Sequence, residues 1–237
     1  MDKTSRRSGQ QSEAWNSRVG TWTGQVEQSP AFLQVRQALL DMADPRSGDR
    51  CVDLGAGSGF VALRLAPQVA SVLAVDIAAD MLASLQEQAQ QLDISNVTVH
   101  TCDMTQLRLA PGSVDLVVSS YALHSLTHQE KRRLLREIHL ALTPGGQLVV
   151  ADMMLGRGLS PRDREIFLDK ARRLARRGPA GLWRLARNAV QLGLGIGENR
   201  PATPGWWSTA LTEAGFSDVR FNDVVAEAGV IAGRKPE

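Results

Sequence analysis

The sequence is poor in cysteine, with two thiols, Cys51 and Cys102, in 237 residues. Neither belongs to a Cys-x-x-Cys pair or has histidines clustered beside it, so a zinc site is not expected. Both lie in apolar stretches, where a free thiol packs as a small hydrophobic group. With no disulfide framework to form, the chain is expected to fold in a reducing compartment, which we take to be the cytoplasm.

Long uncharged apolar stretches are also missing. A membrane-spanning helix needs about 20 such residues, and no segment reaches that length. Residues 1–13 are polar and charged and lack the apolar core of a signal peptide. We expect them to form a disordered arm in front of a single domain over residues 14–237.

Net charge is small, because 27 Lys and Arg residues against 25 Asp and Glu leave +2. This balance gives no general reason to expect a nucleic-acid partner. The charge is unevenly spread, however. Between Arg157 and Arg187, nine Arg and one Lys stand against three acids, so this segment carries +7 and the rest of the chain −5.

From Arg50 onward, short apolar runs alternate with stretches of helical periodicity. The runs predict strands over residues 51–54, 71–75, 97–102, 114–119 and 147–152, and the stretches between them predict helices over 60–66, 79–92 and 128–142. Such alternation is typical of α/β domains with a doubly wound, mostly parallel sheet.

The two ends of the domain depart from this alternation. Residues 14–44 predict one or two amphipathic helices, broken near Ser29-Pro30. After a helix over 206–214, strands over 216–225 and 229–234 lie too close together to enclose a crossover helix, so they are expected to pair antiparallel. The sheet would then have seven strands, with a helical insert over 156–200 between the fifth and sixth.

A glycine-rich turn with Gly55, Gly57 and Gly59 follows the first predicted strand. Glycine permits a sharp turn and a close approach of ligand to main chain. Asp76 ends the second strand about 20 residues further on, where an acidic side chain binds ribose hydroxyls. The turn differs from a dinucleotide fingerprint, since Gly59 comes one place early and Asp53 would set a carboxylate beside a pyrophosphate. These residues predict a site for an adenosine-type ligand.

The run VDLGAGSG over residues 52–59 resembles motif I of class I S-adenosylmethionine-dependent methyltransferases, and further matches follow in the same order. Residues 74–77 resemble the acidic ribose-binding loop, 101–104 the loop at the adenine edge, 114–119 motif IV and 142–148 the turn before the fifth strand. The resemblance covers about residues 50–155 closely and the last strand pair loosely. Within the class it is greatest to the quinone-biosynthesis and other small-molecule enzymes.

The resemblance implies a Rossmann-like fold that uses S-adenosylmethionine and releases S-adenosylhomocysteine. No metal is expected, because the sequence has no carboxylate set like that of the metal-dependent catechol enzymes. The cofactor-binding residues that the resemblance implies are Asp53, Gly55, Ala56, Gly57, Asp76, Ile77, Met81, Asp103, Met104 and Ser119. Structural roles remain open for several of them. The glycines could form a tight connection without a ligand, Asp76 could cap a helix, Asp103 could form a loop turn and Met81 could belong to the core.

His124 is the candidate catalytic residue. It follows the fourth predicted strand, at the edge of the sheet where ligands bind in this architecture. Histidine accepts protons near neutral pH and could act as general base for an acceptor that loses a proton. Alternatively His124 orders the loop or borders the methionine part of the cofactor, because position alone does not make a base. Tyr121 could face the cofactor or the core.

The absence of one motif limits the kinds of methyl acceptor that we expect. Residues 119–122 read Ser-Ser-Tyr-Ala and lack the Asn/Asp-Pro-Pro-Tyr of enzymes that methylate amide or nucleobase nitrogens. We therefore expect methyl transfer to an O, N or C atom of a small organic metabolite. Two alternatives stay open: a cyclase or alkyl transferase of the same fold, or a catalytically silent binding module. An NAD-dependent oxidoreductase is disfavoured by the position of Gly59.

The Arg-rich insert stands where related enzymes build a substrate lid, and three interpretations of it are open. It could capture an acidic acceptor, dock on an anionic membrane to reach a lipophilic one, or form a solvated helix face. It could also close over the site or meet a second subunit in a homodimer. Trp15, Trp22, Trp206 and Trp207 could line an acceptor pocket or pack in the core.

Overall fold

The computed structural model describes residues 9, 12–13, 15–16, 29–154, 201–225 and 228–237. The predicted insert over 156–200 lies outside these residues, as does most of the predicted arm. Ser12 and Glu13, at the end of that arm, are helical, and the Ser12 hydroxyl donates to the Ile77 carbonyl at 3.0 Å.

The described residues form a seven-stranded sheet with the order β3-β2-β1-β4-β5-β7-β6. Its strands are β1 (Arg50–Leu54), β2 (Ser71–Asp76), β3 (Val97–Thr101), β4 (Val114–Ser120), β5 (Leu142–Met153), β6 (Ser217–Val225) and β7 (Ala228–Arg234). Strands β1 to β5 pair in parallel, whereas β7 runs antiparallel to both β5 and β6. The predicted doubly wound, mostly parallel sheet with an antiparallel last pair is confirmed.

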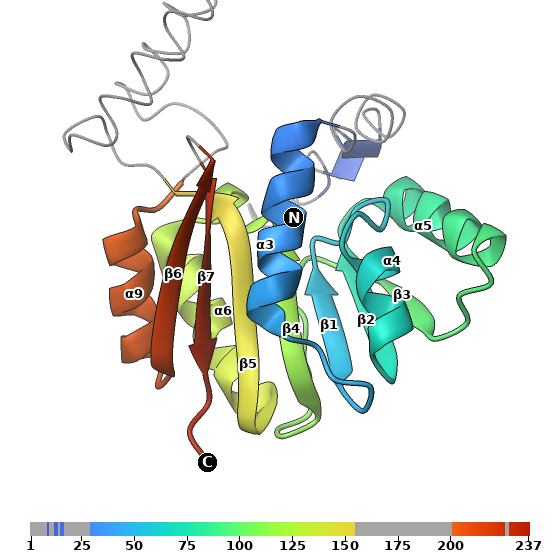
Figure 1. Ribbon diagram of the computed structural model, residues 1–237. Coiled ribbons are helices and arrows are strands. Elements are labelled where there is room, and N and C mark those ends of the chain that lie inside the picture. Colours follow the sequence, from blue (N-terminus) through green and yellow to red (C-terminus); the bar gives the residue numbers. More distant parts are fainter. Residues whose placement is uncertain (1–8, 10–11, 14, 17–28, 155–200, 226–227) are drawn as a thin grey trace, which may run out of the picture.

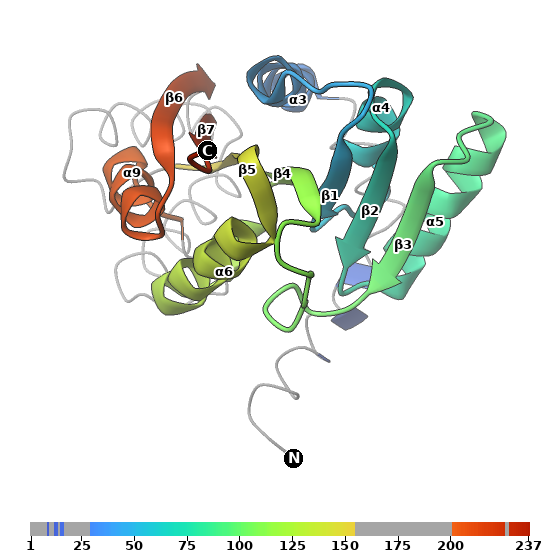
Figure 2. The ribbon, with the colours of Figure 1, turned by 90° about the horizontal axis from the view of Figure 1, so that it is seen from below.

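Helices cover both faces of this sheet (Figure 1). They are α3 (Pro30–Ala43), α4 (Ala62–Leu65), α5 (Ala79–Gln91), α6 (His128–Ala141) and α9 (Pro204–Glu213), with short 3₁₀ turns η2 (Ala66–Gln68) and η3 (Leu123–Ser125). Apolar side chains of α3, α4 and α5 form one core with the sheet, and those of α6 and α9 form a second core on the opposite face. The view from below shows this division plainly (Figure 2).

Most predicted elements agree with the structure to within two residues, but two differ. The helix expected over 60–66 is only α4 followed by η2, because Pro67 has no N–H with which to continue an α-helix. Strand β5 begins at Leu142 rather than 147, since Leu142 already pairs with Val114 before the Pro-Gly-Gly turn shifts the register.

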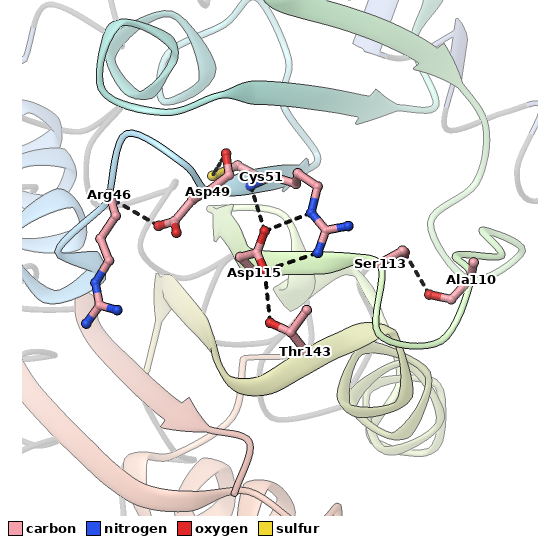
Figure 3. A network of polar contacts seen from close by, with 8 residues as sticks. Arg46, Asp49, Cys51, Ala110, Ser113, Asp115 and Thr143 are labelled. Atoms are coloured by element: carbon pink, nitrogen blue, oxygen red, sulfur yellow. Dashed lines mark hydrogen bonds and ion pairs between the residues drawn. The ribbon is translucent and has the colours of Figure 1, made fainter. Parts of the chain in front are cut away.

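The amino ends of three strands are joined by one carboxylate (Figure 3). On β4, Asp115 accepts hydrogen bonds from the backbone N–H and the guanidinium Nε of Arg50, both at 2.9 Å, and from the Thr143 hydroxyl at 2.9 Å. The Arg50 guanidinium lowers the pKa of Asp115 to about 2. These bonds connect β1, β4 and β5 at the edge opposite the carboxyl ends of the strands.

Over the described ranges, none of the helices combines the length and the apolar character that crossing a membrane requires.

Candidate functional site

Among the described residues, a pocket opens at the carboxyl ends of β1, β2 and β4. After β1 the chain adds strands on one side of the sheet, and from β4 onward it adds them on the other. The connections therefore diverge between β1 and β4, which leaves a crevice there; ligands bind at this position in open α/β sheets. Nine of the ten residues predicted to bind cofactor line the pocket, as does His124.

The glycine turn between β1 and α4 is held by close packing on two sides. Gly55 has a φ of +73°, and a Cβ on it would lie 2.3 Å from the Ala122 Cβ. Gly59 has a φ of +96°, and its Cβ would lie 2.8 Å from Leu63. By contrast, a Cβ on Gly57 would meet nothing within 4 Å. Gly55 and Gly59 thus serve the turn itself, while the side of Gly57 is open.

Asp76 connects the end of β2 to this turn. One carboxylate oxygen accepts the Gly57 N–H at 2.9 Å, and the other accepts the Ala78 N–H at 2.9 Å. Burial raises the pKa of Asp76, and these backbone donors act in the opposite direction. The N-cap residue of α5 is Ala78, so Asp76 is not the N-cap that the sequence left open. Its oxygens retain lone pairs that can accept hydroxyl groups of a ligand.

Asp53 lies beneath the same turn, with only 1% of its surface exposed. Burial raises the pKa of its carboxyl to about 7, and the charge of Asp76 adds to this rise. The backbone N–H of Ala62 lowers the pKa in part, although it does not reach hydrogen-bond geometry. Neither Asp53 oxygen has a hydrogen-bond partner among the described residues, and neither does the buried Ser120 hydroxyl in the same pocket. Such groups suit a ligand that brings donors or positive charge.

Two more of the predicted cofactor residues, Met81 at the start of α5 and Asp103 in the loop after β3, lie at the pocket. Met81 is 2% exposed and belongs to the pocket lining as well as the core. Asp103 also lines the pocket, while its carboxylate accepts the Thr105 N–H at 2.9 Å and the Thr105 hydroxyl at 2.7 Å. The alternatives considered for Met81 and Asp103 are therefore not exclusive. Met81 packs in the core, Asp103 forms a loop turn, and both also line the pocket.

Ser119 departs from its predicted position. Its side chain is fully buried, and its hydroxyl donates to the Leu54 carbonyl at 2.8 Å. It does not line the pocket, whereas Ser120 does. Successive side chains of a strand point to opposite faces, so only one of two adjacent serines on β4 can face the site. Ser120 rather than Ser119 therefore lines the pocket, and the cofactor-binding role of Ser119 stays a prediction.

His124 lies on η3, and its imidazole is mostly buried at the edge of the pocket. Its Nδ1 is 2.7 Å from the Oδ1 of Asp152, and its backbone N–H donates to Oδ2 of the same carboxyl at 2.7 Å. Sequence reasoning missed Asp152. The available signal was an acidic residue near the end of the fifth strand, at the sheet edge that carries the site.

The aromatic residues separate into two groups. Trp15 and Tyr121 line the pocket, and the Tyr121 ring stacks on Phe32 with centroids 4.4 Å apart. Trp207 is buried in the core that α6 and α9 form with the sheet, and the ring centroids of Trp206 and Trp207 are 5.3 Å apart. These two residues do not line the pocket. Trp22, also considered for the acceptor pocket, lies outside the described residues.

Among the residues that the structure describes, no group of three or more His, Cys, Asp or Glu side chains is arranged to hold a metal ion.

Comparison with known proteins agrees with the geometry. Residues 51–146 match the family described as a methyltransferase domain. The chain is 34% identical over 141 residues to an arsenite methyltransferase of Aquipseudomonas alcaligenes, an alignment that covers 55% of this chain and 38% of the relative. It is 33% identical over 114 residues to a ubiquinone/menaquinone biosynthesis C-methyltransferase of Rubrivivax gelatinosus, covering 48% and 43%.

A similar solved structure is that of Haemonchus contortus phosphoethanolamine N-methyltransferase 2 in complex with S-adenosyl-L-methionine. Its TM-score is 0.65 at 18% identity, over 85% of this chain and 52% of that one. This likeness shows a shared fold. The chain spans about two fifths of the length of the two curated relatives.

Proposed function

We propose that this chain carries a class I, S-adenosylmethionine-dependent methyltransferase domain and that it transfers a methyl group to an O, N or C atom of a small organic molecule. The observation that supports this most strongly is the pocket at the divergence between β1 and β4. It brings Asp53, Asp76 and Asp103 together with the glycine turn, in which the space beside Gly57 is open.

The residues present fit the cofactor. S-Adenosylmethionine bound there would supply a methyl group on a positively charged sulfur, open to displacement by a nucleophile. In our proposal Asp76 accepts ribose hydroxyls, for which its oxygens keep lone pairs. Asp53 is a buried acid without a hydrogen-bond partner among the described residues, and a cationic ligand would offset the cost of its burial. Ile77 and Met81 offer apolar surface to the base.

His124 is proposed as general base for the acceptor. Its imidazole borders the pocket, and Nε2, the nitrogen turned away from Asp152, makes no hydrogen bond to a described residue. Nε2 can therefore take a proton from an acceptor group that becomes a nucleophile. Much of the remaining acceleration would come from holding the acceptor and the methyl group together in the pocket.

A small acceptor is supported by the names of the relatives, which specify arsenite and quinone biosynthesis. The Arg-rich segment between Arg157 and Arg187 supports an acidic acceptor through arginine pairing, or a lipophilic one reached at an anionic membrane surface. We also propose that the chain forms a homodimer through this insert, which lies outside the described residues.

Calorimetric titration with S-adenosylmethionine and S-adenosylhomocysteine tests the cofactor site. We expect wild type to bind both and Asp76→Ala to bind them about 10- to 100-fold more weakly, the loss expected for a hydrogen bond to a charged group. Asp80→Ala removes an exposed carboxylate four residues away and should bind as wild type does. The unfolding temperature is measured in parallel, because Asp76 also holds Gly57 and Ala78.

Failure of folded wild type to bind either ligand would contradict the proposal. Binding by wild type without any methylated product from a panel of phenols, carboxylic acids and amines would direct attention to cyclisation, alkyl transfer or a silent binding role.

A further inference from the structure

Asp152 is an acidic side chain that is buried inside the sheet. It lies on β5, an interior strand between β4 and β7, and its side chain is 1% exposed. The two residues that precede it on the strand, Val150 and Ala151, belong to the apolar cores. A carboxylate is retained in such surroundings only when it is well paired, because removing its charge from water is unfavourable.

The partners of Asp152 determine what it can do. Its Oδ2 accepts the backbone N–H of His124 at 2.7 Å, and its Oδ1 accepts the Met153 N–H at 2.7 Å. Backbone N–H groups can only donate, so both oxygens act as acceptors. The same Oδ1 lies 2.7 Å from the His124 Nδ1. An ionised carboxylate has no proton to give, so with Asp152 ionised the ring supplies the proton of this bond.

We infer that Asp152 is a positioning residue that holds the His124 imidazole with its proton on Nδ1, and so presents Nε2 to the pocket as a hydrogen-bond acceptor. A neutral imidazole has one donor and one acceptor nitrogen, and the bond made by one nitrogen sets the state of the other. Because the carboxyl contacts both the backbone and the ring of one residue, it also fixes the direction of the ring.

This inference rests on the proposed function and makes the role of His124 there specific. A hydroxyl or N–H of the acceptor would donate to Nε2, and its proton would pass to that nitrogen as the acceptor's electron pair forms the bond to the methyl carbon. The pair of the breaking carbon–sulfur bond stays on sulfur. Asp152 would then stabilise the imidazolium that forms, as a carboxylate does behind other catalytic histidines. An acceptor with an ionisable hydroxyl group, such as a phenol or enol, suits this arrangement.

A purely structural role makes a different prediction. If Asp152 only accepted the backbone N–H of His124 and stabilised η3, its removal would cost stability but would not decide which ring nitrogen is protonated. Long-range proton–nitrogen correlation spectra of the histidine side chains distinguish the two roles, because protonated and unprotonated ring nitrogens give well-separated signals. The chain has four histidines, and loss of signals in His124→Gln identifies those of His124.

The spectra are recorded at a pH above which the ring signals no longer change. We expect wild-type His124 to show a protonated Nδ1 and an unprotonated Nε2. In Asp152→Ala the two nitrogen signals should converge as the tautomers exchange, while Glu87→Ala, which removes an exposed carboxylate on α5, should leave them at the wild-type positions. Asp152→Asn provides a second variant of nearly the same shape, in case the alanine variant does not fold.

A wild-type ring with its proton on Nε2 would overturn the inference without any variant, as would an unchanged Nδ1 tautomer in folded Asp152→Ala. Calorimetry on the same samples keeps the two proposals apart. Expected spectra from a protein that does not bind S-adenosylmethionine would uphold the inference about Asp152 and contradict the proposed function.

Discussion

Asp53 and Asp115 are carboxyl groups near opposite ends of two adjacent strands, and their surroundings move their pKa values in opposite directions. Burial beneath the glycine turn raises the pKa of Asp53 from 3.8 to about 7. Hydrogen bonds from Arg50 lower that of Asp115 to about 2. Ionisation of Asp53 therefore lowers the free energy of unfolding of the protein, whereas ionisation of Asp115 raises it. Only Asp53 borders the pocket.

Replacement of Asp53 should therefore change how stability depends on pH. Between about pH 4 and 7 the folded protein keeps a proton on Asp53 that the unfolded chain has lost, so the free energy of unfolding falls as pH rises. Asp53→Asn removes this dependence. Relative to wild type, the variant should gain ~1.4 kcal/mol for each pH unit in this window, up to ~4 kcal/mol.

Urea unfolding of the ligand-free protein at a series of pH values measures this gain. Asp80→Asn, which changes an exposed carboxyl, should follow wild type throughout. Equal differences between wild type and Asp53→Asn at pH 5 and pH 8 would show that Asp53 is not protonated in the folded protein.

At the scale of an element, the start of α6 positions the turn that carries His124. Thr127 accepts the Glu130 N–H at 3.2 Å, and Glu130 in return accepts the Thr127 N–H at 2.6 Å, which makes a complete capping box. One turn later, the buried Lys131 donates its ammonium to the Leu126 carbonyl at 2.6 Å. The residues between η3 and α6 are thus held from the helix side, independently of Asp152.

Thr127→Ala should destabilise the protein by ~1 kcal/mol, because it leaves the Glu130 N–H without its side-chain acceptor. The midpoint and slope of urea unfolding give this value. Thr209→Ala is the matched control: Thr209 is exposed within α9, where alanine is the better helix former, so this change should be neutral or slightly stabilising. A loss as large in Thr209→Ala would mean that the capping box is not the cause.

At the scale of the whole molecule, the carboxyl ends and the amino ends of the strands differ in what they carry. The carboxyl ends of β1, β2 and β4 carry the pocket, where the buried Asp53 has no hydrogen-bond partner among the described residues. The amino ends of β1, β4 and β5 carry the bonds from Arg50 and Thr143 to Asp115. The bonds to Asp115 thus join three strands at the end that has no part in the proposed chemistry, while the unpartnered carboxyl of Asp53 lies at the pocket.

Acid titration of stability tests the contribution of that opposite edge. Asp115 stabilises the fold above about pH 4, and its contribution is lost as pH falls through about 2. Asp115→Asn should therefore be less stable than wild type near pH 6, by ~1 kcal/mol because the pair is partly exposed, and the two should approach each other near pH 2. Glu87→Gln should show no such convergence. A constant difference across the range would rule out a role for the charge of Asp115.

Much of the fold was determined by local sequence. Strand and helix periodicities, the glycine run and the short spacing of the last two strands predict the sheet, because each pattern acts within a few residues. The same patterns placed nine of ten predicted cofactor residues and His124 at one edge, since parallel strands end together. The role of those residues in binding stays a prediction until a ligand is titrated.

Only the tertiary structure decided the rest. Whether Ser119 or Ser120 faces the pocket depends on the pleat of β4 in its sheet, which two adjacent serines do not reveal. The pairing of His124 with Asp152 joins residues 28 positions apart through the register of β4 against β5. The separation of Trp206 and Trp207 from the pocket depends on which face α9 covers. Contacts between distant segments are set by packing of the whole sheet, and no local pattern records them.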